Sequence, residues 1–238
     1  MQKINYQREL DEILDFLSKG FQNQQTRLSS CKKPSLLLHA CCGPCSSYVI
    51  EYLAKYFDIT IFYYNPNIFP AEEYERRLNE LKNLLPRFPA ALQNNVKFVE
   101  QNYDPEEFYS ALEIKNHPEF AGEPEKGERC RRCYQFRLKR AFKYAAENNF
   151  EYFCTTLSIS PFKDAEKINR IGKELCLSNP EKNPKWLPAD FKKNGGFKRS
   201  LELSQEYGLY RQQYCGCVYS KTNTEKFRAE HNNNSAQQ

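Results

Sequence analysis

The sequence predicts an α/β fold, a single domain in which a mainly parallel sheet is flanked by helices. Short apolar or β-branched runs alternate along the chain with longer segments of helical periodicity. The 238 residues, of which 40% are hydrophobic, suffice for one sizeable core. Alternation of strands with helices favours parallel pairing with helices on both faces of the sheet.

The two ends of the chain differ in composition from the middle. Residues 3–24 predict a helix, because their apolar side chains recur at helical spacing along one stripe. We therefore assign residues 1–30 to an N-terminal helical extension and residues 31–222 to the α/β domain. Cys31 lies alone in a polar connector, and we interpret it as incidental. The polar residues 223–238 are expected to form a disordered tail.

The first half of the domain predicts three strands. Leu36–Leu38 is a short apolar run typical of a buried strand, and Pro44 suits the first turn of a helix that reaches about residue 56. A second strand is expected over 59–64, a helix over 70–85 and a third strand over 96–99.

The second half is more irregular. Residues 100–125 hold eight acids and one lysine, which favours a solvated loop with a short helix. The elements expected after it are a helix over 130–148, a strand over 152–155, a helix capped by Ser160 and Pro161, a loop-rich insertion over 179–199 and a helix over 200–207.

Charge and apolar content indicate which classes of protein this sequence fits. The net charge of +5 is modest, and no window approaches the roughly 18 apolar residues of a membrane span. The N-terminus is polar and lacks the apolar stretch of a signal peptide. We therefore expect a cytoplasmic protein without a membrane partner. In that reducing compartment, ten cysteines indicate metal or redox chemistry rather than structural disulfides.

Three thiols lie together just after the first predicted strand. Cys41, Cys42 and Cys45 fall where that strand gives way to a helix. Exposed N–H groups and the positive end of the helix dipole favour thiolate over thiol at this position. Ligands of open α/β sheets also gather at the carboxyl ends of the strands. The junction is thus a candidate reactive or metal-binding site.

A second group, Cys130 and Cys133, has C-x-x-C spacing at a helix start. Together with Cys41 and Cys42 it provides four thiolates, the number that a cubane iron–sulfur cluster or a structural zinc requires. A vicinal pair suits a zinc knuckle poorly, so we favour iron–sulfur and leave zinc open. Four arginines lie near the second pair and would offset the charge of a thiolate-ligated cluster: Arg129, Arg131, Arg132 and Arg137.

A third group is Cys215-Gly216-Cys217. A disulfide between these cysteines would close a tight, easily reduced ring, which favours a redox-active pair over a structural link. The alternative is that both thiols are further metal ligands.

Basic residues are concentrated in two runs. Residues 126–143 hold eight basic residues and one acid, and residues 182–199 hold six and one, with three aromatic side chains among the latter. Either run alone is explained by a solvated surface. Their combination with a thiol-rich site suggests RNA, whose unstacked bases bind aromatic platforms beside Lys and Arg.

Five segments resemble the epoxyqueuosine reductases of the QueH type, in that family's order. They are LLLHACCGPCSSYVI, CRRCYQFRL, TTLSISPFKD, FKKNGGFKRS and LYRQQYCGCVYS, and the match spans about residues 36–220. The resemblance implies a sheet of the Rossmann-like kind seen in the adenine-nucleotide alpha-hydrolases, and makes 31–222 a catalytic metallo-domain. It implies cobalamin-independent reduction of epoxyqueuosine to queuosine at the wobble position of tRNA, the last step of queuosine synthesis, with an unidentified electron donor.

The resemblance also implies roles for individual residues. Cys41, Cys42, Cys130 and Cys133 would hold a 4Fe-4S cluster, and Cys215 and Cys217 would be the redox-active pair. The family is associated with one additional mononuclear iron. Its candidate ligands here are Cys45, Cys215, Cys217 and a carboxylate, Asp164, which is also a candidate for the chemistry itself.

Two other functions remain open at this point. An ATP-dependent tRNA thiolation-type enzyme needs a Gly-rich phosphate loop after the first strand, and the sequence there, ACCGPCSS, has one glycine and no Asp. A zinc-stabilised RNA-binding module would use the same cysteines without redox chemistry. The reductase hypothesis has the advantage that a dithiol supplies the two electrons and two protons that epoxide deoxygenation requires.

Overall fold

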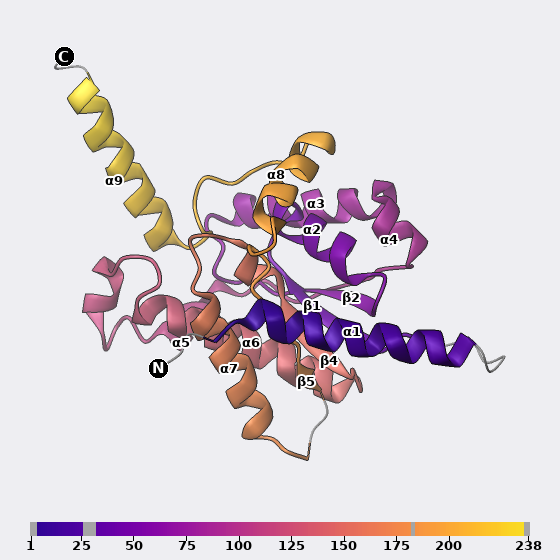
Figure 1. Ribbon diagram of the computed structural model, residues 1–238. Helices are drawn as coiled ribbons and strands as arrows, with labels where there is room; N and C mark the ends of the chain where they lie inside the picture. The colour runs from indigo at the N-terminus through magenta and orange to yellow at the C-terminus, as the bar shows by residue number, and fades with distance from the viewer. Residues whose placement is uncertain (1–3, 26–31, 182–183, 236–238) are drawn as a thin grey trace.

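The sheet has five strands, all parallel, in the order β3-β2-β1-β4-β5. The computed structural model describes residues 4–25, 32–181 and 184–235 (Figure 1). The strands are β1 (Ser35–Ala40), β2 (Asp58–Tyr63), β3 (Lys97–Glu100), β4 (Tyr152–Thr155) and β5 (Lys185–Trp186). This is the order of doubly wound, Rossmann-like sheets, so the predicted α/β class is confirmed.

Helices connect the strands and cover both faces of the sheet. They are α1 (Tyr6–Gln25), α2 (Gly43–Leu53), α3 (Ala71–Leu84), α4 (Pro89–Gln93), α5 (Pro105–Leu112), α6 (Glu128–Glu147), α7 (Ala165–Leu177), α8 (Gly196–Glu206) and α9 (Val218–Ser235). None of the described helices combines the length and the apolar content that crossing a membrane demands.

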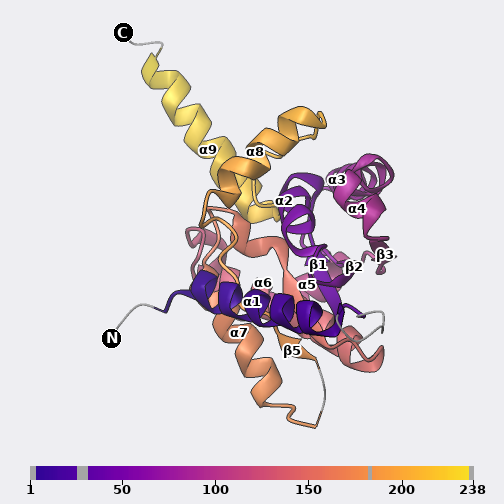
Figure 2. The same cartoon turned by 45° about the vertical axis from the view of Figure 1, so that its right-hand side comes forward.

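The alternation of side chains along β1 explains the two-sided core. Leu36 and Leu38 point to one face, where they pack with residues of α1, α2, α3 and α8. Leu37 points to the other face and packs with residues of α6 and α7. Figures 1 and 2 show α2 and α3 on one side of the sheet and α6 and α7 on the other. Because β1 is buried on both faces, its sequence is a continuous apolar run and does not alternate between apolar and polar residues.

A buried histidine ties the carboxyl ends of three adjacent strands together. His39 Nδ1 lies 2.7 Å from Thr155 Oγ1 at the end of β4, and its Nε2 lies 3.1 Å from the Tyr64 carbonyl oxygen just after β2. Burial lowers the pKa of His39 to about 3, so the ring is neutral. These contacts fix the sheet edge from which Cys41 and Cys42 emerge.

The acidic residues 100–125 contain the short helix α5 and a 3-10 helix (Pro118–Gly122) joined by loops, in line with the expected loop and short helix. Two other segments differ from expectation. Helix α7 is capped by Asp164 rather than by Ser160. Residues 223–235 of the tail that was expected to be disordered lie within helix α9, which projects away from the sheet (Figure 1). Its polar composition indicated disorder, because it offers no apolar stripe to bury against the domain. Cys31 lies outside the described residues.

Candidate active site

The first three predicted thiols meet at the junction of β1 and α2. Cys42 is the extended N-cap residue of α2, and Cys45 lies in the first turn of that helix. The sulfurs of Cys41, Cys42 and Cys45 all lie within 4.8 Å of one another, with 3.8 Å between the first two. Among the described residues, this is the one group of three side chains with metal-ligand spacing.

Hydrogen bonding among these three sulfurs shifts their pKa values in opposite directions. Hydrogen bonds from the Cys42 and Cys45 thiols hold the pKa of Cys41 well below its ordinary value, although burial acts in the opposite direction. The hydrogen bond to Cys41 raises the pKa of Cys42 to about 12 and that of Cys45 well above its usual range. Cys41 is therefore the sulfur of this group that loses its proton most readily.

Two buried cations face the thiols. The Arg137 side chain, on a residue only 1% exposed, has its guanidinium 4.0 Å from Cys133 Sγ, and the Lys163 Nζ, on a residue 6% exposed, lies 2.8 Å from Cys215 Sγ. Burial alone lowers the pKa of Lys163, but the negative charge of Cys215 and its neighbours raises it well above its usual value. Within the described part of the chain, neither cation forms an ion pair with a carboxylate. Arg137 also donates a hydrogen bond to the neutral Asn65 side chain, so the groups near these two cations that can carry negative charge are the cysteine sulfurs.

The second predicted pair lies near the first group but outside it. Cys130 and Cys133 are in the first turns of α6, where burial raises the pKa of Cys130 to about 11. Cys133 packs with Cys217 in a small apolar cluster. The charges of both Cys133 and Cys41 raise the pKa of Arg137, against the effect of its burial. The assignment of Cys130 and Cys133 to one centre with Cys41 and Cys42 stays a prediction.

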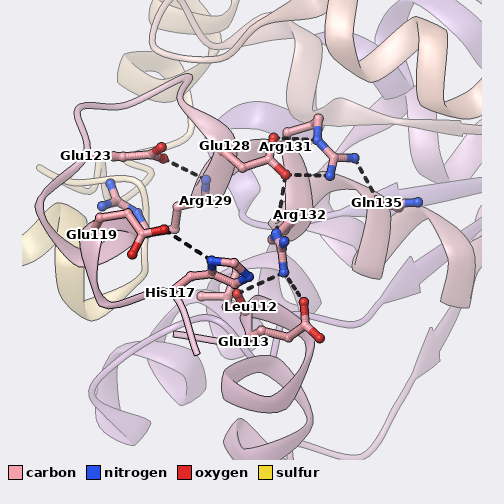
Figure 3. Close-up of polar contacts among 10 residues, drawn as sticks. All are labelled: Leu112, Glu113, His117, Glu119, Glu123, Glu128, Arg129, Arg131, Arg132 and Gln135. Carbon is pink, nitrogen blue, oxygen red and sulfur yellow. Dashed lines mark hydrogen bonds and ion pairs between the residues drawn. The ribbon is translucent and has the colours of Figure 1, made fainter. Parts of the chain in front are cut away.

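Two other arginines of α6 form ion pairs with nearby acids, and a third is held by backbone carbonyls. Arg131 pairs with Glu128, and Arg132 pairs with Glu113 and Glu128 (Figure 3). Arg129 donates to two backbone carbonyls of the 3-10 helix. The sequence therefore overstated the positive charge around Cys130 and Cys133, and Arg137 is the arginine of this helix that contacts a sulfur.

A buried arginine holds the backbone of the Cys-Gly-Cys loop. Arg77 donates to the carbonyl oxygens of Cys215 at 3.1 Å and Tyr214 at 3.3 Å, and its own charge is balanced by Glu73 at 2.7 Å. Gly216 has a φ of +135°, and a Cβ there would lie 3.1 Å from the Arg77 guanidinium. The loop conformation thus requires glycine.

A cavity of about 630 Å³ opens over these sulfurs. Cys41, Cys45 and Cys215 line it together with Lys163, whereas Asp164 lines a neighbouring cavity. The Asp164 carboxylate accepts a hydrogen bond from the Lys167 backbone N–H at 3.1 Å, which is the N-cap contact of α7. The cavity lies at the carboxyl edge of the sheet, between β1 and β4, where the strand order reverses.

Comparison with known proteins decides the family. The sequence profile described as "Epoxyqueuosine reductase QueH" matches residues 36–223. The chain belongs to the QueH family. A relative of that name from Streptococcus pyogenes serotype M1 is 40% identical over 219 residues, 92% of this chain and 79% of the relative. Two others are those of Acinetobacter baylyi, 40% identical over 194 residues (81% and 83%), and Thermotoga maritima, 35% identical over 189 residues (78% and 90%).

Three site residues of this QueH-family chain were not found from its sequence. Lys163 and Arg77 look like ordinary surface cations there, and Gln212, whose Nε2 lies 3.0 Å from Cys42 Sγ, looks like a polar loop residue. Their roles depend on contacts between segments more than 50 residues apart. The only available signal was that Lys163 and Gln212 lie within segments that resemble the family.

Proposed function

We propose that this chain reduces epoxyqueuosine to queuosine at the wobble position of tRNA, the last step of queuosine synthesis. A tRNA substrate places the reaction in the cytoplasm. The observation that supports this most directly is the pair of buried cations, Arg137 and Lys163, which face cysteine sulfurs and no carboxylate at the expected edge of the sheet. Buried positive charge of this kind matches a centre made of thiolates.

The residues present fit an iron centre. Cys41, Cys42, Cys130 and Cys133 would hold a 4Fe-4S cluster, and Cys45 is the candidate ligand of an additional iron. The sulfurs of Cys41, Cys42 and Cys45 lie within 4.8 Å of one another, so this edge of the sheet offers the thiolate ligands that an iron centre requires. When bound, such a centre supplies electrons one at a time and Lewis acidity toward an oxygen.

The Cys215–Cys217 pair completes the electron balance. Oxidation of two thiols to a disulfide releases two electrons and two protons. Removal of the epoxide oxygen breaks both C–O bonds, leaves an alkene and consumes those two electrons and two protons as the oxygen departs as water. An external electron donor, not yet identified, then reduces the disulfide for the next turnover.

The surrounding residues hold this pair in place. Lys163 donates a hydrogen bond to Cys215 Sγ at 2.8 Å and places a positive charge beside that sulfur. Arg77 fixes the backbone on the amino side of Gly216, and the Phe69 N–H donates to the Gly216 carbonyl oxygen at 2.8 Å. Cys215 lines the cavity, whereas Cys217 lies buried behind it beside Cys133.

Anaerobic iron and sulfide quantification, paired with an assay on tRNA that carries epoxyqueuosine, tests the proposal. Cys215→Ala should keep the iron and lose turnover, whereas Cys176→Ala, a change on α7, should keep both. Colourless protein with one zinc and no turnover would instead support an RNA-binding module. Turnover that requires ATP would support a thiolation-type enzyme.

A further inference from the structure

An aromatic side chain is exposed at the wall of the thiol cavity. Phe162 is 68% exposed, although it follows directly from the buried segment after β4. Eight large apolar side chains are exposed among the described residues, and only Phe162 and Phe227 line this cavity. Exposing a phenyl ring to water is unfavourable. Because this ring lies at the wall of the cavity with the reactive sulfurs, we infer that a ligand covers it.

Hydrogen bonds of the backbone hold Phe162 next to Lys163, the residue that contacts the reactive sulfur. The Phe162 N–H donates to Ser160 Oγ at 3.3 Å, and the Lys163 N–H donates to the Ser160 carbonyl oxygen at 3.2 Å. The next side chain, Lys163, ends 2.8 Å from Cys215 Sγ. A flat group stacked on the phenyl ring would therefore lie beside the sulfur that carries out the proposed reduction.

Positive charge lines the same cavity. Arg211 and Arg228 both contribute to its wall, and neither forms an ion pair with a carboxylate within the described residues. The Arg211 guanidinium donates to Ser204 Oγ at 3.2 Å and lies 5.9 Å from the centre of the Phe197 ring. Arg228 donates to the Gln213 side chain from the middle of α9. A ligand with a flat ring and nearby negative charge fits this combination.

We propose that Phe162 is the platform on which the wobble nucleobase of tRNA stacks after it leaves the anticodon stack, while Arg211 and Arg228 contact the flanking phosphates. This inference rests on the proposed function, because it takes tRNA as the substrate. Enzymes that act on a base extrude it from its stack, and aromatic side chains replace the lost stacking partners. The cavity volume of about 630 Å³ lies within the range of small-ligand sites.

The test uses full-length, metal-loaded protein kept anaerobic, and an anticodon stem-loop RNA with 2-aminopurine at the wobble position. Phe162→Ala should weaken binding about 5- to 100-fold and abolish the quenching that stacking causes. Phe162→Trp should restore both, whereas Phe16→Ala, an equally apolar change at a 77% exposed site on α1 away from the cavity, should change neither. Iron content should be the same in all four proteins.

The outcomes separate this inference from the proposed reaction. Wild-type affinity and quenching in Phe162→Ala would overturn the stacking role, as would an equal loss in Phe16→Ala. If the wild-type protein binds and quenches as described but does not reduce epoxyqueuosine, the reaction fails while the stacking role stands. If turnover is normal and Phe162→Ala leaves the KM for tRNA unchanged, the reaction stands and the stacking role fails.

Discussion

The Lys163 ammonium and the Cys215 sulfur, from segments 52 residues apart, meet at 2.8 Å beneath the cavity. Removing the charge with Lys163→Met should slow single-turnover reduction about 10- to 100-fold, since a hydrogen bond to a charged group contributes about 1.5–3 kcal/mol. The rate of Cys215 alkylation by iodoacetamide should fall in parallel, because the variant lacks the positive charge that lies 2.8 Å from the sulfur. Lys192→Met is the matched control, since Lys192 pairs with Asp190 instead. Unchanged alkylation in Lys163→Met would remove the proposed role.

Gly216 links the two sulfurs of the redox pair. Gly216→Ala should lose most of its turnover while keeping its iron, because a φ of +135° and the nearby Arg77 guanidinium both oppose a Cβ. Backbone strain of this kind costs about 1–3 kcal/mol. Gly122→Ala, where a Cβ would meet nothing within 4 Å, serves as the control. Turnover and thermal unfolding measured side by side separate loop distortion from general unfolding, and equal activity in the two variants would contradict the prediction.

Substitutions of Cys45 and Cys130 should change the metal content in different ways. Cys130→Ala should lose both visible colour and turnover, because it removes a proposed cluster ligand. Cys45→Ser should keep colour and sulfide but lose about one iron per chain, because its sulfur adjoins Cys41 and Cys42 without belonging to the predicted cluster set. Elemental analysis with sulfide quantification provides the measurement. Loss of all iron from Cys45→Ser would show that Cys45 is a cluster ligand.

Asp164 has two candidate roles that substitutions can separate. Asn caps a helix about as well as Asp, so Asp164→Asn should keep both stability and turnover if capping is its function. Asp164→Ala should lower the free energy of unfolding by about 1 kcal/mol, measured by urea denaturation. Loss of turnover in a stable Asp164→Asn protein would support the chemical or iron-ligating role expected from the sequence.

Local patterns were sufficient to predict most of the fold. The apolar run at Leu36, the proline of α2 and the alternation of strands with helices each depend on neighbouring residues, and the structure confirms them. The start of α7 was misplaced, because Ser160 and Asp164 are both good N-caps and only the hydrogen bond to Lys167 decides between them. The two-residue strand β5 was missed, since its pairing with β4 leaves no periodic signal in a loop rich in lysine and proline.

The candidate site was predicted less completely than the fold. The sequence identified every sulfur of the cavity, because clustered cysteines in a reducing compartment indicate chemistry. It did not identify which cations are buried beside them. Arg77, Arg137 and Lys163 are chemically identical to the solvated cations around them, and only tertiary packing distinguishes them. The acids that pair with two other arginines of α6 were likewise interpreted as solvated surface.

The burial of Arg137 has a consequence for how this protein matures. Before the cysteines bind metal, no carboxylate of the described residues balances the enclosed guanidinium, which disfavours the folded state. Iron delivery then does more than activate the site, since it supplies the charge that the folded core requires. We expect iron-starved cells to contain less of this protein, because newly made chains that lack metal stay open to proteolysis.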